Sequence, residues 1–293
     1  MHRTNESVRA MTTHNTALNQ FVDADGVRYA YRRFGKPNGM PLVLLQHFIG
    51  TMDWWDPRLT DGLAETREVI LLDNRGVGLS SGETPNRIDA MAADIHAFIH
   101  ALGLTQVDVL AFSIGGFVGQ ELALIYPGDV RKIILVGTGP RGGEGMQQPR
   151  EDVVKALSIG DHNAARAYLF FSQSEKGQTA AREFLARTAE RKVDLDPEAS
   201  TQTMQAQEEA IGEWGLVASH SGYLSRLREL KHPVFIANGN DDIMVPTVNS
   251  TILFNAIPNA QLVLYPDSGH GALFEYADLF VQHANLFLDH NDF

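Results

Sequence analysis

The sequence has 293 residues, 44% of them hydrophobic, and a formal net charge of −12 at pH 7. This composition is typical of a globular protein, and the negative charge argues against a nucleic-acid partner, because such proteins bind through clustered Lys and Arg. The absence of cysteine excludes disulfides, thiolate nucleophiles and Cys-ligated metals. There is no run of 18 apolar residues and no signal-peptide pattern at the start, so we expect a cytoplasmic protein without a membrane partner. No pattern indicates an oligomeric state.

After a polar segment at residues 1–20, which we expect to be a flexible tail, short β-branched apolar runs alternate with segments of helical period. This alternation predicts an α/β fold with a mostly parallel sheet. The solid apolar runs suit strands that helices cover on both faces. The predicted strands are Val27–Arg32, Pro41–Gln46, Glu68–Asp73, Gln106–Phe112, Arg131–Val136, Pro233–Asn238 and Gln261–Tyr265.

Residues 141–229 differ from the rest, because strand signals disappear and helical segments follow one another. Gly or Pro separates several of these segments, as is typical of breaks between helices. We interpret the interval as a helical cap inserted between strands 6 and 7 of an α/β core that comprises residues 21–140 and 230–293. The predicted cap helices cover residues 152–160, 163–171, 180–188 and 203–215.

Ser113 is the candidate nucleophile, because it directly follows the predicted strand that ends at Phe112 and precedes a run of helical period. This arrangement of strand, turn and helix is typical of a nucleophile elbow. Such a turn needs small residues, since larger side chains would strike the neighbouring strand or helix, and Ala111, Gly115 and Gly116 meet this need. The alternative is a serine that caps an ordinary helix.

A serine hydroxyl becomes nucleophilic when an imidazole removes its proton and a buried acid orients that imidazole. Two loops that follow predicted strands carry these residue types. Asp241 and Asp242 follow the strand that contains VFIAN, and His270, with glycine on both sides, follows the strand that contains LVLY. Together with Ser113 they form a candidate triad whose acid is Asp241 or Asp242.

The segments AFSIGG, GNDDIMVP and SGHGALFE resemble the three catalytic blocks of α/β-hydrolase-fold enzymes, in the branch that contains esterases and cofactor-free haloperoxidases. The resemblance covers nearly all of the chain outside the cap and implies an eight-stranded, mostly parallel sheet flanked by helices. The chain order in this family is Ser, Asp, His. Its spacing places the acid three residues after a Gly and four before a Pro, which selects Asp242. The resemblance implies no metal and no organic cofactor.

Two backbone N–H groups are expected to stabilise the negative charge that acyl transfer places on the carbonyl oxygen. One should belong to Ile114, directly after the candidate nucleophile. The resemblance places the second in the loop after the second predicted strand, where family members commonly read His-Gly-x and this chain has His47 and then Phe48. We expect Phe48 to supply the N–H, and His47 in place of glycine departs from the family pattern. The candidate substrate pocket consists of His47, Met52, Trp54 and Trp55.

These features predict a hydrolase of a small ester or lactone that forms an acyl-enzyme on Ser113. In this prediction His270 acts first as base and then as acid, Asp242 orients it, and the partner is a small ester-like molecule. The same residues would serve a cofactor-free perhydrolase, a C–C bond hydrolase or an acyltransferase. A ligand receptor that retains the triad is the alternative from another class.

Two other patterns point to different chemistry. Residues 137–142 match a dinucleotide-binding fingerprint, but Pro140 and the glycines that follow it do not open the helix that such a site needs. His96 and His100 lie four residues apart on a predicted helix, as in a zinc pair, yet Ala97 stands where the zinc motif has glutamate and no third ligand is evident. We therefore expect neither a dinucleotide site nor a metal site.

Overall fold

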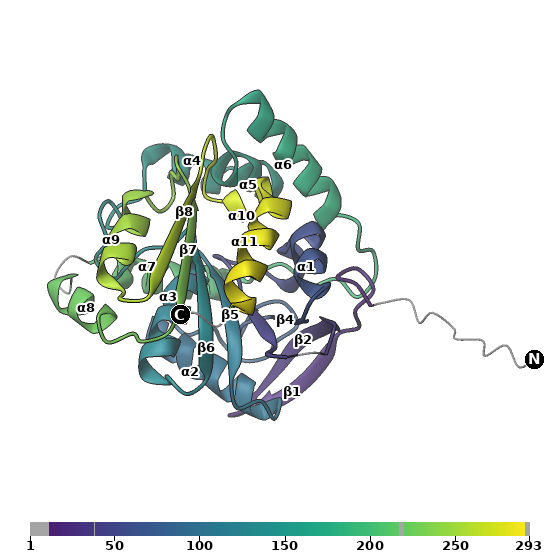
Figure 1. The fold of residues 1–293 in the computed structure, drawn as a ribbon. Helices are drawn as coiled ribbons and strands as arrows, with labels where there is room; N and C mark the ends of the chain where they lie inside the picture. The colour runs from purple at the N-terminus through teal and green to yellow at the C-terminus, as the bar shows by residue number, and fades with distance from the viewer. Residues whose placement is uncertain (1–11, 38, 217–219, 291–293) are drawn as a thin grey trace, which may run out of the picture.

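The computed structural model describes residues 12–37, 39–216 and 220–290, and an eight-stranded sheet lies at its centre (Figure 1). The strand order is β1-β2-β4-β3-β5-β6-β7-β8, in which β3 to β8 run parallel and β1 and β2 pair antiparallel. The predicted α/β class and mostly parallel sheet are confirmed. The strands are β1 (Gln20–Ala24), β2 (Val27–Gly35), β3 (Leu42–Leu45), β4 (Glu68–Leu72), β5 (Val107–Phe112), β6 (Val130–Val136), β7 (Val234–Gly239) and β8 (Ala260–Tyr265).

Every strand predicted from the sequence is present close to its expected bounds, and β1 is the strand that the sequence analysis did not assign. A two-residue loop joins β1 to β2, and its residues Asp25 and Gly26 have φ values of 47° and 78°. Positive φ at both loop residues matches the twist of the paired strands, which favours Asp-Gly at such a hairpin.

The predicted flexible tail at residues 1–20 is too long. Residues 1–11 lie outside the described residues, but His14 and Ala17 are buried. The backbone N–H of His14 donates to Asp61 Oδ1 at 2.7 Å, and Ala17 O accepts from Arg191 at 2.9 Å. These contacts attach the segment to the folded chain, which then continues directly into β1.

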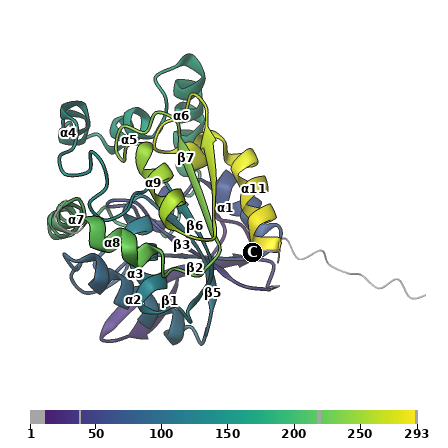
Figure 2. The same cartoon turned by 60° about the vertical axis from the view of Figure 1, so that its left-hand side comes forward.

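Alternating side chains of the strands fill an apolar layer on each face of the sheet. Leu44 belongs to the layer that α1 and α11 cover, whereas its neighbour Val43 belongs to the layer that α2, α3 and α9 cover (Figure 2). Burial on both faces explains the solid apolar runs of the parallel strands. The covering helices are α1 (Pro57–Ala64), α2 (Ile88–Ala101), α3 (Ile114–Ile125), α9 (Val248–Ala256) and α11 (Ala277–Asp289).

Five helices lie between β6 and β7 in the described chain, and they occupy two places. In both views α4, α5 and α6 lie beyond the upper ends of the strands, whereas α7 and α8 lie lower, beside the sheet (Figures 1 and 2). Trp214 of α7 stacks on Phe117 of α3 with ring centroids 5.0 Å apart, so this part of the interval packs into the core. The helices are α4 (Glu151–Ser158), α5 (His162–Phe170), α6 (Glu175–Thr188), α7 (Thr201–Trp214) and α8 (His220–Leu227).

The first four of these helices match the helices predicted in the interval, and α8 is an addition to them. Among the described residues, no helix combines the length and the apolar character needed to cross a membrane. We call α4, α5 and α6 the cap helices.

Candidate active site

Ser113 stands on a sharp turn between β5 and α3. Its φ of 59° and ψ of −122° lie in a region that non-glycine residues rarely adopt, and such strain clusters at functional sites. A Cβ at Gly115 would lie 2.4 Å from the carbonyl oxygen of Leu45 on the neighbouring strand β3. The turn therefore accepts no side chain two residues after Ser113, which is the steric requirement that the sequence predicted.

The structure brings Ser113, His270 and Asp242 into one chain of hydrogen bonds. His270 Nε2 lies 2.9 Å from Ser113 Oγ, and His270 Nδ1 lies 2.8 Å from Asp242 Oδ2. Because a carboxylate only accepts, Nδ1 carries the proton in this arrangement and Nε2 is free to accept the serine proton. The three residues follow β5, β8 and β7, so all three stand at the carboxyl ends of parallel strands.

The structure distinguishes the two neighbouring aspartates. Asp242 is buried, and its second oxygen, Oδ1, accepts from the backbone N–H groups of Met244 at 2.9 Å and Val245 at 3.0 Å. Asp241 is exposed, and no hydrogen bond joins it to His270 in the described chain. The geometry therefore favours Asp242 as the partner of the imidazole, in agreement with the family spacing.

The glycines on both sides of His270 face the cap. Gly271 N donates to the Phe170 carbonyl oxygen at 2.7 Å, and a Cβ on Gly271 would lie 2.7 Å from Phe170 Cβ. A Cβ on Gly269 would lie 3.0 Å from the same carbonyl oxygen. The last residue of α5 thus packs directly against the His270 loop, and glycine permits this close approach.

Between His47 and Gly50, in the loop after β3, three of the four backbone N–H groups have acceptors in the described chain. The N–H of His47 donates to Gln46 Oε1 at 3.0 Å, that of Ile49 to Gln207 Oε1 at 2.6 Å, and that of Gly50 to His47 O at 3.0 Å. No acceptor for the Phe48 N–H is found in the described part of the chain. Ile114 begins α3, and the first N–H of a helix has no acceptor within the helix. Phe48 and Ile114 are thus the available donors near the elbow.

Two side chains that the sequence analysis did not select hold this loop in place. Gln207, from α7, accepts the Ile49 N–H, and Asp73, after β4, accepts the N–H of Met52 at 2.9 Å. Gln207 lies 158 residues from Ile49 in the chain, so no local pattern indicates the contact. Both side chains position the backbone that carries the Phe48 N–H.

A cavity of about 390 Å³, open solvent included, reaches Ser113 and His270. His47 and Trp54, two of the four residues expected in the substrate pocket, line it. Met52 and Trp55 do not: both have 0% exposure and belong to the core, where Trp55 packs against Phe112 with centroids 6.4 Å apart. The short 3-10 turn Met52–Trp54 directs these neighbouring side chains to different surroundings. The other lining residues are Phe48, Ile49, Leu157, His162, Ala165, Arg166, Leu169, Phe170 and Met244.

His47 is neutral in this cavity. Burial, followed by the positive charge of Arg166, lowers the pKa of His47 to about 3. Its Nδ1 donates to the Phe48 carbonyl oxygen at 2.9 Å, because a carbonyl can only accept. Nε2 is therefore an unprotonated acceptor, and it has no partner among the described residues.

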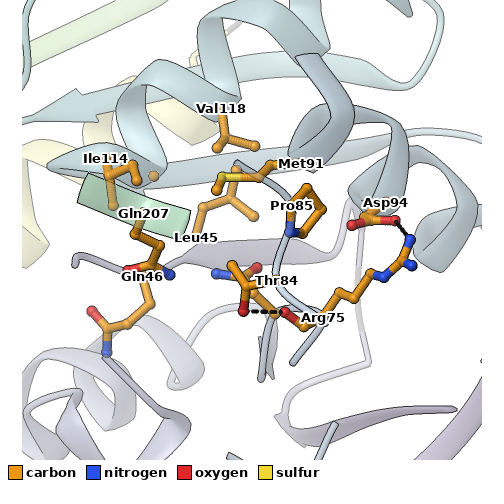
Figure 3. A pocket seen from close by; sticks show the side chains of 12 residues that line it. Leu45, Gln46, Arg75, Thr84, Pro85, Met91, Asp94, Ile114, Val118 and Gln207 are labelled. Atoms are coloured by element: carbon orange, nitrogen blue, oxygen red, sulfur yellow. Dashed lines mark hydrogen bonds and ion pairs between the residues drawn. The ribbon is translucent and has the colours of Figure 1, made fainter. Parts of the chain in front are cut away.

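A second cavity lies near the elbow, and Figure 3 shows Gln46, Gln207 and Ile114 in its wall. Neither Ser113 nor His270 lines it. In the same wall Arg75 pairs with Asp94 at 3.7 Å, and Thr84 Oγ1 donates to the Arg75 carbonyl oxygen at 3.0 Å (Figure 3). These polar groups bind within the wall and hold the loop after β4, away from the reacting side chains.

The expectation that His96 and His100 lack a third ligand is wrong. Asp129, directly before β6, places Oδ2 at 2.6 Å from His96 Nδ1 and Oδ1 at 3.1 Å from His100 Nε2. One ligand atom from each residue lies within 4.8 Å of the others, so the group could hold a metal ion. It lies at the amino end of β6, whereas Ser113, Asp242 and His270 lie past the carboxyl ends of strands.

Comparisons with known proteins agree with this geometry. A family model described as alpha/beta hydrolase fold matches residues 41–277. A solved alpha/beta hydrolase fold protein from Chitinophaga pinensis is 42% identical, with a TM-score of 0.89 over 94% of this chain and 99% of that one. RutD of Azorhizobium caulinodans, named as a carbamate hydrolase, is 30% identical over 227 residues, which are 76% of this chain and 82% of that protein.

A solved N-acyl homoserine lactone degrading enzyme is 25% identical, with a TM-score of 0.72 over 92% of this chain and 100% of that one. The family model covers most of the chain, and the fold is that of the matched structures. The chain is therefore an enzyme and belongs to the α/β-hydrolase fold family.

Proposed function

We propose that the protein hydrolyses small carboxylic esters or lactones through an acyl-enzyme on Ser113. The observation that carries this proposal is the hydrogen-bonded series Ser113, His270, Asp242, with distances of 2.9 Å and 2.8 Å. This is the arrangement in which an imidazole activates a serine hydroxyl and a buried carboxylate fixes the imidazole tautomer.

In the first half of the reaction, His270 Nε2 takes the hydroxyl proton while Ser113 Oγ attacks the substrate carbonyl. The negative charge that develops on the carbonyl oxygen is stabilised by the N–H groups of Phe48 and Ile114. The imidazolium then protonates the leaving alkoxide, and the acyl group remains on Ser113. Asp242 stays ionised throughout and stabilises the imidazolium.

In the second half, water replaces the alcohol. His270 removes a proton from the water, hydroxide attacks the acyl carbonyl, and the returning proton restores the Ser113 hydroxyl. Every proton is transferred through His270, so the mechanism requires no metal ion and no organic cofactor.

The cavity lining and the relatives guide the choice of test substrates. The lining includes Leu157 and Leu169 from the cap helices, which supports a role of these helices in substrate selection. A structurally similar enzyme degrades a lactone, and RutD is named for a carbamate, which also carries an acyl carbonyl. Esters, lactones and carbamates therefore belong in one activity screen.

The test is to replace Ser113 with alanine and to measure turnover of short-chain p-nitrophenyl esters, lactones and carbamates. We expect kcat to fall roughly 10⁴-fold or more, since both acylation and deacylation need the hydroxyl. Ser158→Ala is the matched control, because Ser158 is an exposed serine at the end of α4. Full turnover by the Ser113 variant would contradict the proposal.

The same screen separates the other functions of this fold. Peracid formation that exceeds ester hydrolysis when hydrogen peroxide is added would identify a perhydrolase.

A further inference from the structure

Arg166, on α5, is a buried cation in the wall of the catalytic cavity. Its residue exposure is 9%, and its guanidinium carbon lies 4.2 Å from the centroid of the Trp54 ring. Nε donates to the His162 carbonyl oxygen at 3.4 Å, and one terminal nitrogen, Nη2, donates to Asn163 Oδ1. The other terminal nitrogen, Nη1, is buried without a partner among the described residues.

The charge of Arg166 has no carboxylate partner. Among the described residues its guanidinium hydrogen-bonds to the His162 carbonyl oxygen and Asn163 Oδ1, and no salt bridge joins it to an Asp or Glu. The nearest carboxyl group with an electrostatic effect on it is Asp161, whose Oδ1 already accepts the N–H groups of Asn163 and Ala164 at the start of α5. Burial lowers the pKa of Arg166 to about 10, so the side chain remains protonated at neutral pH. A buried charge without a counter-ion destabilises a fold, which makes such a group a marker of function.

Arg166 also lines two neighbouring pockets. It lines the cavity that holds Ser113 and His270, and it lines a more open pocket at the surface together with Glu198. Trp54 and His162 also line both the cavity and the surface pocket. In the cavity, Arg166 is the only Lys or Arg among the described lining residues, and Leu157 and Leu169 supply an apolar wall beside it.

We propose that Arg166 binds a carboxylate on the acyl chain of the substrate, so that the preferred substrate is a short ester or lactone with a second, anionic end. The unpartnered Nη1–H supplies a charge-assisted hydrogen bond, and the Trp54 ring holds the guanidinium in place. The apolar wall accommodates the methylene groups between the two ends. This inference rests on the proposed function, because the reacting carbonyl is placed at Ser113.

The test compares monomethyl glutarate with methyl valerate, two methyl esters whose acyl chains have the same length and differ in the terminal carboxylate. For the wild type we expect kcat/KM to be about tenfold or more higher for the monoanion, the value of one good hydrogen bond to a charge. Arg166→Gln should reduce this ratio about tenfold, mainly through KM, and Arg166→Lys should retain part of it. Arg182→Gln, which changes an exposed arginine on α6, should leave the ratio as in the wild type.

A binding measurement separates failure of this inference from failure of the proposed function. Calorimetry on Ser113→Ala measures the affinity for monomethyl glutarate without turnover, and Ser113→Ala/Arg166→Gln should bind it at least tenfold more weakly. Circular dichroism and thermal melts establish that each variant is folded, and Arg166→Lys retains the charge if the glutamine variant does not fold. Equal affinity in the two variants, or an unchanged substrate ratio in Arg166→Gln, would overturn the inference even if Ser113 is the nucleophile.

Discussion

The two sides of the catalytic cavity are built differently. On the side of the sheet, Ser113, Asp242 and His270 stand on loops that directly follow strands, and backbone contacts hold each loop. On the side of the cap, the lining comes from α4 and α5, and in the described chain no hydrogen bond joins these helices to the side chains of Ser113, Asp242 or His270. In the proposed mechanism the core therefore fixes the geometry of the reaction, and the cap helices determine which acyl chain fits.

One contact crosses this division. The Phe170 carbonyl oxygen, at the end of α5, accepts the Gly271 N–H at 2.7 Å. The loop of His270 is thus held partly by the cap. Substitutions on the core side should therefore change the rate of the chemical step, whereas substitutions in the cap helices should change which substrate is preferred. The contact between Phe170 and Gly271 is the exception, because it joins the two sides.

The largest expected effect on the core side comes from the acid. Asp242→Asn removes the carboxylate that fixes the His270 tautomer, and kcat for ester hydrolysis should fall roughly 10⁴-fold. The matched change at the exposed neighbour, Asp241→Asn, should leave kcat within about twofold, since surface substitutions of this kind have small effects. Steady-state kinetics with one ester measure kcat for both variants. An equal decrease in kcat in the two variants would reject Asp242 as the acid.

A smaller effect should follow when α7 loses its contact with the loop after β3, which carries the Phe48 N–H. Gln207→Leu leaves the Ile49 N–H buried without an acceptor. We expect this to raise the free energy of the transition state by about 2 kcal/mol, which lowers kcat/KM roughly 30-fold. The loss should lie in kcat, because Gln207 does not line the cavity at Ser113 and His270. Gln205→Leu, at an exposed position on the same helix, is the control. A change confined to KM would show that α7 contributes to binding instead.

The smallest expected effect concerns pH and the free energy of unfolding. His47 has a folded pKa of about 3, below the unfolded value of 6.5, because burial disfavours its charged form. As pH falls below 6.5, the unfolded chain takes up a proton that the folded chain does not, so stability present above pH 6.5 is lost. Between pH 6.5 and 5.5 the loss is about 1.4 kcal/mol or less for this residue.

Urea denaturation of the wild type and of His47→Gln at pH 7.5, 6.5 and 5.5 measures this contribution. The glutamine variant should lose less stability on acidification than the wild type, and its slope against pH should be flatter. Identical slopes would show that His47 has the same pKa in the folded and the unfolded protein, against the lowered value. His14, whose pKa burial also lowers to about 3, should behave in the same way in His14→Gln.

The sequence predicted the parts of the molecule that local steric rules determine. The elbow at Ser113 and the glycines beside His270 are readable because backbone atoms of neighbouring segments exclude any larger residue there. The buried strands are readable because both faces demand apolar side chains. Strand β1 was missed because it is a largely exposed edge strand, although Asp25-Gly26 after it is a hairpin signal.

Other features depend on how distant segments meet. Met52 and Trp55 stand in the expected loop, but the turn between them directs both into the core, and no local pattern encodes that direction. Gln207 and Asp129 contact residues far away in the chain, so only the packed fold reveals them. The lone charge of Arg166 was equally hidden, because an arginine on an amphipathic helix ordinarily faces solvent.

The most direct test of the central claim is mass spectrometry of the intact protein, mixed with a p-nitrophenyl ester and quenched in acid within the first turnover. The account predicts a mass increase equal to one acyl group in the wild type, located on Ser113 by fragmentation, and no increase in Ser113→Ala. An acyl adduct on another residue, or one that persists in Ser113→Ala, would contradict it.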